Sequence, residues 1–147
     1  MSPLTTDDRC AILELLSRYS HAIDSGSAEE FASLFTTDGT WDGPGGRHTG
    51  SRQLASMLLA YREHPDVRSS RHWVSGTTLA GQSDHVVATS YSLCVGPGPS
   101  GDDVIVELIG KYLDVIVRED GAWRFKSRHV VDVHPRAVTE FQLEEAQ

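Results

Sequence analysis

The spacing of apolar residues divides this chain into a helical first half and a strand-like second half. Between Thr6 and Gly26 the apolar side chains recur every three or four positions, at Ile12, Leu15, Leu16, Tyr19 and Ile23. Thr6 is a suitable N-cap, and Asp7 and Asp8 place negative charge in the first turn, where the helix dipole favours it. The pattern predicts an amphipathic helix that ends at Gly26.

Two further helices are predicted before the midpoint. Ser27 and Glu30 form a capping-box pattern ahead of the apolar residues Phe31, Leu34 and Phe35. Asp38-Gly39 indicates a turn, and Thr40-Trp41 is expected to open a short strand. Ser51 is expected to cap a third helix with apolar positions at Leu54, Met57, Leu58 and Tyr61.

The second half predicts four strands, at residues 71–79, 85–95, 104–117 and 122–133. The third is too long to be flat, so a bulge is expected near Gly110. Helices followed by antiparallel strands indicate an α+β fold. A curved, mostly antiparallel sheet wrapped over three N-terminal helices would form a cone-shaped barrel with a pocket inside.

Composition limits the classes of function. The 147 residues, 39% of them hydrophobic, suit a single domain over 1–147 with its core at about 6–133 and a partly disordered tail at 136–147. The net charge of −8 argues against nucleic acid and anionic membranes as partners. No spanning apolar run or signal peptide is visible, so a cytoplasmic protein is expected.

Histidines and cysteines do not form a metal-binding pattern. His21, His48, His64 and His85 are expected at the surface or in turns, with no His-x-x-x-His pair or acidic cluster to support a site. The only cysteines, Cys10 and Cys94, lie in a helix and a strand pattern and are expected to be buried thiols. No metal and no cofactor are predicted.

Three residues could together move a proton beside a carbonyl group. Tyr19 could donate to a developing oxyanion, His72 has an imidazole that could take up and release a proton, and Asp24 could hold one imidazole tautomer. Each also has an ordinary interpretation, with Tyr19 in the core, Asp24 in solvent and His72 as a satisfied interior histidine. As a set, they are predicted to be catalytic.

Four other residues are predicted to contact a substrate. Trp41 is a candidate for the pocket wall, although a core position is the favoured interpretation for both Trp41 and Trp73. Ser90 lies on a strand face of small residues. Ser127 and His129 alternate with a basic strand face, so they would line the pocket if the basic face points outward; the alternative is that they pack against a partner subunit.

Several motifs, in order, resemble a known family. They are Arg18-Tyr19, Asp24, the stretch from Phe31 to Gly39, Arg71-His72, and Gly121 to Phe125. This order is similar to the SnoaL-like branch of the nuclear transport factor 2-like superfamily. The resemblance implies a cone-shaped α+β barrel, a homodimer and an internal ligand pocket.

Within that family, Tyr19, Asp24 and His72 match the catalytic pattern of scytalone dehydratase and bile-acid dehydratase, although the second long strand lacks the further carboxylate of such enzymes. An epoxide-hydrolase pattern would use Asp114 and Asp132, but no arginine between them suits the role. The resemblance implies a cofactor-independent lyase (dehydratase) or isomerase that acts on a small hydrophobic molecule, a cyclic carbonyl compound such as a steroid or polyketide. The alternative is a binding or subunit-assembly module with no turnover.

Overall fold

A computed structural model describes residues 4–64 and 69–135, with side chains up to residue 131. The fold is α+β, as predicted, and contains the helices α1 (Thr6–Ser25), α2 (Ala28–Ser33) and α3 (Gly50–Glu63). No helix in these ranges combines the length and apolarity needed to cross a membrane. The tail at 136–147, for which the sequence predicts partial disorder, lies outside the described residues.

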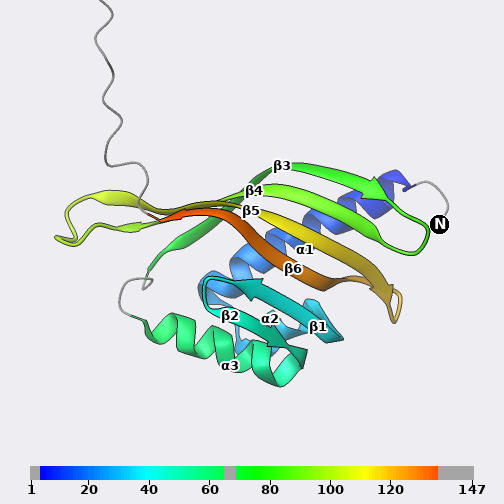
Figure 1. Cartoon of the computed structure of the whole chain (residues 1–147), viewed down its shortest axis with the longest axis horizontal. Coiled ribbons are helices and arrows are strands. Elements are labelled where there is room, and N and C mark those ends of the chain that lie inside the picture. The colour runs from blue at the N-terminus through cyan, green and yellow to red at the C-terminus, as the bar shows by residue number, and fades with distance from the viewer. Residues whose placement is uncertain (1–3, 65–68, 136–147) are drawn as a thin grey trace, which may run out of the picture.

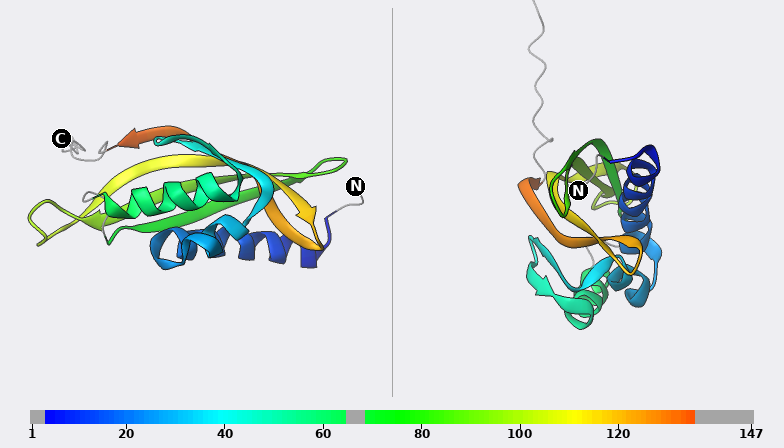
Figure 2. Two further views of the ribbon diagram at one scale, coloured as in Figure 1. Left: turned by 90° about the horizontal axis from the view of Figure 1, so that it is seen from below. Right: turned by 90° about the vertical axis from the view of Figure 1, so that its right-hand side faces the viewer.

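One curved, unclosed sheet contains the six strands β1 (Phe35–Gly43), β2 (Gly46–Thr49), β3 (Arg71–Gly81), β4 (Val86–Pro97), β5 (Val104–Glu119) and β6 (Ala122–Pro135). Their order is β2-β1-β6-β5-β4-β3, and all neighbours are antiparallel except β1 and β6 (Figure 1). The helices lie along the open side of the curved sheet, so sheet and helices enclose an interior (Figure 2).

Local sequence signals account for the helix ends, with small shifts. The N-cap of α1 is Thr5, one residue before the expected Thr6, because Thr5 and Asp8 form a reciprocal capping box. Ser27 caps α2 as predicted, by accepting a hydrogen bond from the Glu30 N–H. Helix α3 begins at Gly50 after Thr49, rather than at a Ser51 cap.

Irregularities in the strand pairing change which side chains face the interior. The pairing of β5 with β6 shifts between Ile109 and Lys111, so the register is irregular near Gly110 as expected, but the extra residue lies on β6 and not on β5. A second shift opposite Lys126 was not expected, and it reverses the alternation along β6. Phe125 is buried before this bulge and Arg128 is buried after it, two positions that an unbroken strand would place on opposite faces.

Two expectations of burial are wrong. Trp73 is 65% exposed, because it alternates with His72 and lies on the outer face of β3. Cys94 is buried as predicted, but Cys10 is exposed on α1, on the side away from the apolar positions. The outer sheet face also exposes other large apolar side chains, from Tyr91, Ile109 and Leu113.

Candidate functional site

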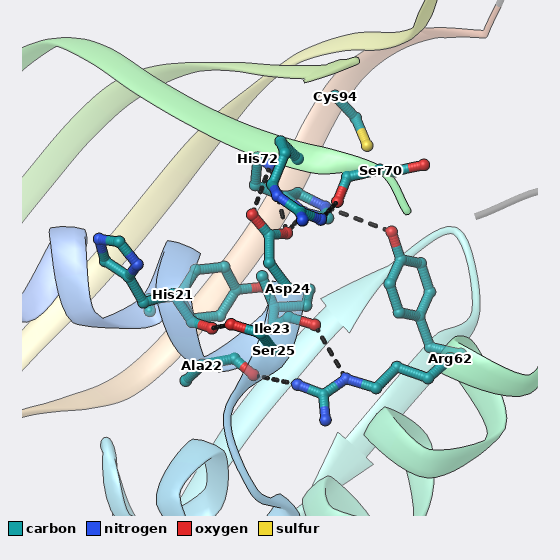
Figure 3. Close-up of polar contacts among 12 residues, drawn as sticks. His21, Ala22, Ile23, Asp24, Ser25, Arg62, Ser70, His72 and Cys94 are labelled. Carbon is teal, nitrogen blue, oxygen red and sulfur yellow. Dashed lines mark hydrogen bonds and ion pairs between the residues drawn. The ribbon is translucent and has the colours of Figure 1, made fainter. Parts of the chain in front are cut away.

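The structure joins Asp24 and His72 in a close pair. Asp24 lies in the last turn of α1, and His72 is the second residue of β3. The Nδ1 atom of His72 is 2.7 Å from Oδ1 of Asp24, and the backbone N–H of His72 donates to both carboxylate oxygens, at 3.1 and 3.2 Å (Figure 3). Their side chains are only 9% and 11% exposed, so little water competes for these bonds.

This arrangement leaves the second ring nitrogen of His72 available. When Nδ1 donates to the carboxylate, Nε2 carries a lone pair and can accept a proton. The hydroxyl of Tyr61, from the last turn of α3, lies 3.5 Å from Nε2, at the limit of a hydrogen bond. The pair therefore has the geometry of a general base with an oriented imidazole.

Arg62 fixes the end of α1 that carries Asp24. Its guanidinium donates from Nε to the carbonyl of Ile23 at 3.1 Å and from another nitrogen to the carbonyl of Ala22 (Figure 3). It also donates to the carbonyl of Gly26. A cation at this position adds hydrogen bonds to carbonyls at the C-terminal end of the helix and complements the negative end of its dipole. Helix α3 thus contributes Tyr61 to the site and holds Asp24 in place through Arg62.

A cavity of about 790 Å³ lies beside this pair. Its wall includes His72 and Tyr61 and is otherwise largely apolar, with contributions from Ile23, Met57, Leu93, Ile105, Leu108 and Val130. This size and lining suit a small hydrophobic ligand with a few polar groups.

Tyr19 lies on the wall of the same cavity and is fully buried. Its hydroxyl accepts a hydrogen bond from Nε1 of Trp41 at 2.9 Å, which leaves its own proton free to donate. Burial raises the pKa of Tyr19, so the hydroxyl stays protonated at neutral pH. Trp41 also lines the cavity. Of the predicted site residues, the structure therefore brings Tyr19, His72 and Trp41 together on the cavity wall, with Asp24 bonded to His72.

The structure does not bring the other three predicted substrate contacts to this cavity. Ser90 is buried with its Oγ 2.9 Å from that of Thr77, away from the cavity wall. Ser127 and His129 lie on the outer side of β6, where the His129 side chain is 55% exposed. The bulge at Lys126 is the physical reason, because it turns Arg128 and Val130 inward instead.

Arg128 forms a buried ion pair that sequence reasoning missed. Its Nε and Nη2 atoms donate to the two carboxylate oxygens of Asp114 at 2.8 and 2.7 Å, and both side chains are 0% exposed. The guanidinium also stacks on the rings of Tyr19, Tyr112 and Phe125, at 3.9–4.3 Å from their centroids. Burial opposes its charge, but the Asp114 carboxylate outweighs burial and raises the pKa of Arg128.

The Arg128–Asp114 pair supplies the arginine that the epoxide-hydrolase interpretation lacked. Arg128 is nevertheless not part of the cavity wall, and the side chain of Asp132 lies outside the described residues. The pair packs against the ring of Tyr19 and does not line the cavity.

Sequence reasoning also missed polar groups on the cavity wall. Tyr61 was counted only as an apolar position of the third helix, while Tyr112, Ser92 and Glu107 were not identified. Only Glu107 left a signal in the sequence, as a carboxylate between apolar residues of a strand, a signal that it shares with Asp114. Within the described ranges, no group of three or more His, Cys, Asp or Glu side chains could hold a metal ion.

Comparisons with known proteins agree with the fold. Residues 5–129 match the SnoaL-like domain family. The anthranilate 1,2-dioxygenase small subunit of Burkholderia cepacia is 27% identical, over 89% of this chain and 91% of that protein.

Solved structures show the same fold. ActVI-ORFA from Streptomyces coelicolor is 25% identical with a TM-score of 0.77, over 86% of this chain and 96% of that one. A putative scytalone dehydratase from Novosphingobium aromaticivorans is 24% identical with a TM-score of 0.75, over 92% and 91%. The family match covers most of the chain, and the fold agrees with it: this protein belongs to the SnoaL-like domain family.

Proposed function

We propose that this protein is a cofactor-independent acid/base enzyme, a lyase (dehydratase) or isomerase, that acts on a cyclic carbonyl-bearing substrate such as a steroid or polyketide. The observation that carries the proposal is the Asp24–His72 pair at the wall of an apolar cavity. The solved structure of a putative scytalone dehydratase with the same fold is consistent with it.

In this mechanism His72 is the general base. Its Nε2 removes a proton from carbon next to the substrate carbonyl, and Asp24 stabilises the imidazolium that forms. Tyr19 donates its hydroxyl proton in a hydrogen bond to the carbonyl oxygen, where negative charge develops. The proton on His72 then returns to a neighbouring carbon in an isomerase, or goes to a departing hydroxyl in a dehydratase.

A simple carbon acid tests the base without knowledge of the natural substrate. We expect the protein to accelerate exchange of the α-protons of 2-tetralone in D₂O, as followed by proton NMR. His72→Asn should reduce the protein-dependent rate by about 10²–10⁴-fold while the chain stays folded.

The matched control is His85→Asn. His85 lies 2.7 Å from Asp84, the same separation as in the Asp24–His72 pair, but the Asp84 side chain is 83% exposed and the cavity wall includes neither residue. Exchange should be unchanged in this variant. Equal rates in His72→Asn and the wild type would contradict the role of His72.

The alternative is a non-catalytic subunit, and the likeness to a dioxygenase small subunit favours it. Such a module has no need of an oriented base at a cavity. It would show no exchange above the buffer rate with 2-tetralone or with larger cyclic ketones, whereas the proposed enzyme would.

A further inference from the structure

A second polar cluster lines the cavity next to the Asp24–His72 pair, and the mechanism above does not use it. Glu107 accepts hydrogen bonds at Oε2 from the hydroxyl of Ser70 at 2.6 Å and from the thiol of Cys94 at 3.4 Å. Glu107 and Cys94 both belong to the cavity wall. Cys94 is the cross-strand partner of His72, so the cluster starts one strand away from the base (Figure 3).

A β-bulge aims Glu107 at the cavity. Cys94 pairs with Leu108 and the next residue, Val95, pairs with Val106, so Glu107 is the extra residue of β5. Bulges of this kind reorient single side chains and are frequent beside active sites. Because of this bulge Glu107 and its neighbour Leu108 both reach the cavity wall, which an unbroken strand would not allow.

Gly96 provides the space for this carboxylate. A Cβ atom at this position would lie 2.2 Å from Oε1 of Glu107 and 2.7 Å from Oγ of Ser70. Any larger residue would therefore push the carboxylate away. Oε1 itself accepts no hydrogen bond from the described residues, whereas Oε2 accepts two.

Ser92 is a second polar group that the mechanism does not use, and it lies on the same face of β4 as Cys94. Ser92 is two residues from Cys94, belongs to the cavity wall and is 4% exposed. Its Oγ finds no hydrogen-bond partner in the described part of the chain. A buried hydroxyl without a partner costs free energy, and a ligand in the cavity could supply that partner.

We propose that Glu107, with Ser92, forms a subsite for a hydroxyl group of the substrate. Oε1 of Glu107 has lone pairs that no described residue uses, so it can accept a hydrogen bond, and a substrate hydroxyl can donate one. The backbones of β3 and β5 are roughly 10 Å apart, two strand spacings, a separation that a fused two-ring compound can bridge. The inference rests on the proposed function and deepens it, because it makes the substrate a hydroxylated ring compound.

Paired ligands that differ in one hydrogen-bond donor test the subsite. The probes are 2-naphthol, which donates from its hydroxyl, and 2-methoxynaphthalene, which cannot; dissociation constants come from NMR titration. The wild type should bind 2-naphthol at least about tenfold more tightly, the effect of one hydrogen bond to a charged group. In Glu107→Gln this preference should fall to about one- to threefold.

Two further variants keep the test decisive if Glu107→Gln folds poorly. Gly96→Ala retains the carboxylate but displaces it, so it should also lose the preference. His72→Asn removes the base and leaves the cluster intact, so it should keep the preference.

The outcomes separate this inference from the proposed function. Equal affinity of the two probes for the wild type, or an unchanged preference in folded Glu107→Gln and Gly96→Ala, overturns the subsite. The rate of 2-tetralone exchange is a separate measurement that tests the proposed function, because it depends on His72 and not on Glu107.

Discussion

Asp24 holds His72 at two points, because its carboxylate accepts hydrogen bonds from both the backbone N–H and the ring Nδ1 of that residue. The backbone bonds attach the start of β3 to the end of α1, and the ring bond sets the direction of the imidazole. A single carboxylate therefore joins two elements and orients the proposed base.

Asp24→Asn should separate orientation from the presence of the base. The amide can keep a hydrogen bond to the backbone N–H of His72, but it no longer selects the tautomer with the proton on Nδ1. We expect ¹⁵N NMR to show a mixture of His72 tautomers and the exchange rate of 2-tetralone to fall by about 10²-fold or more. A single unchanged tautomer with full exchange would contradict the pairing.

Tyr19→Phe should affect both stability and catalysis. The variant leaves the buried Trp41 Nε1–H without its acceptor, so the free energy of unfolding should fall by about 1–3 kcal/mol, as measured by urea denaturation. If Tyr19 also donates to the substrate, exchange should fall by more than tenfold in protein that remains folded. Lost stability with unchanged exchange would make Tyr19 purely structural.

Replacing Asp114 alone should lower the free energy of unfolding more than replacing Asp114 and Arg128 together. Asp114→Asn leaves the charge of Arg128 uncompensated in the core, which should cost about 3–5 kcal/mol of unfolding free energy. Arg128→Met in the same protein removes that charge, so the double variant should recover part of the loss. Denaturant unfolding of all four proteins gives the coupling, and additive losses would argue against the pair.

The two cysteines should differ in reactivity toward a thiol reagent. Burial, and next the hydrogen bond to Glu107, raise the pKa of Cys94 to about 12, so at pH 8 it remains a protonated thiol. Cys10 is exposed. Ellman's reagent at pH 8 should therefore modify one thiol quickly in the native protein and two after denaturation; rapid modification of both in the native state would contradict this assignment.

The outer sheet face should mediate a homodimer. Trp73, Tyr91, Ile109 and Leu113 are all exposed on strands β3 to β5, and such apolar side chains are typical of subunit interfaces. We expect light scattering to report a dimer at micromolar concentration and Tyr91→Glu to shift it toward the monomer. The matched control is Leu59→Glu, on the exposed face of α3, which should leave the dimer intact. A wild-type protein that is monomeric would contradict the prediction.

Local patterns in the sequence determined the elements of this protein. Helices and strands arise from the 3.6- and 2-residue spacing of apolar side chains and from capping at Thr5 and Ser27, which depend on neighbours a few residues away. The order of motifs, with Asp24 and His72, was sufficient to predict the family and the pair that the structure shows.

Only the tertiary structure decided which other residues face the cavity. The bulges at Glu107 and Lys126 arise from the register between neighbouring strands, and each changes the face on which the following side chains lie. Simple alternation therefore predicted Ser127 and His129 inside, while the folded sheet turns Arg128 inward and aims Glu107 at the cavity. The Arg128–Asp114 pair and the Arg62 contacts with α1 depend on the same long-range packing, which no local pattern encodes.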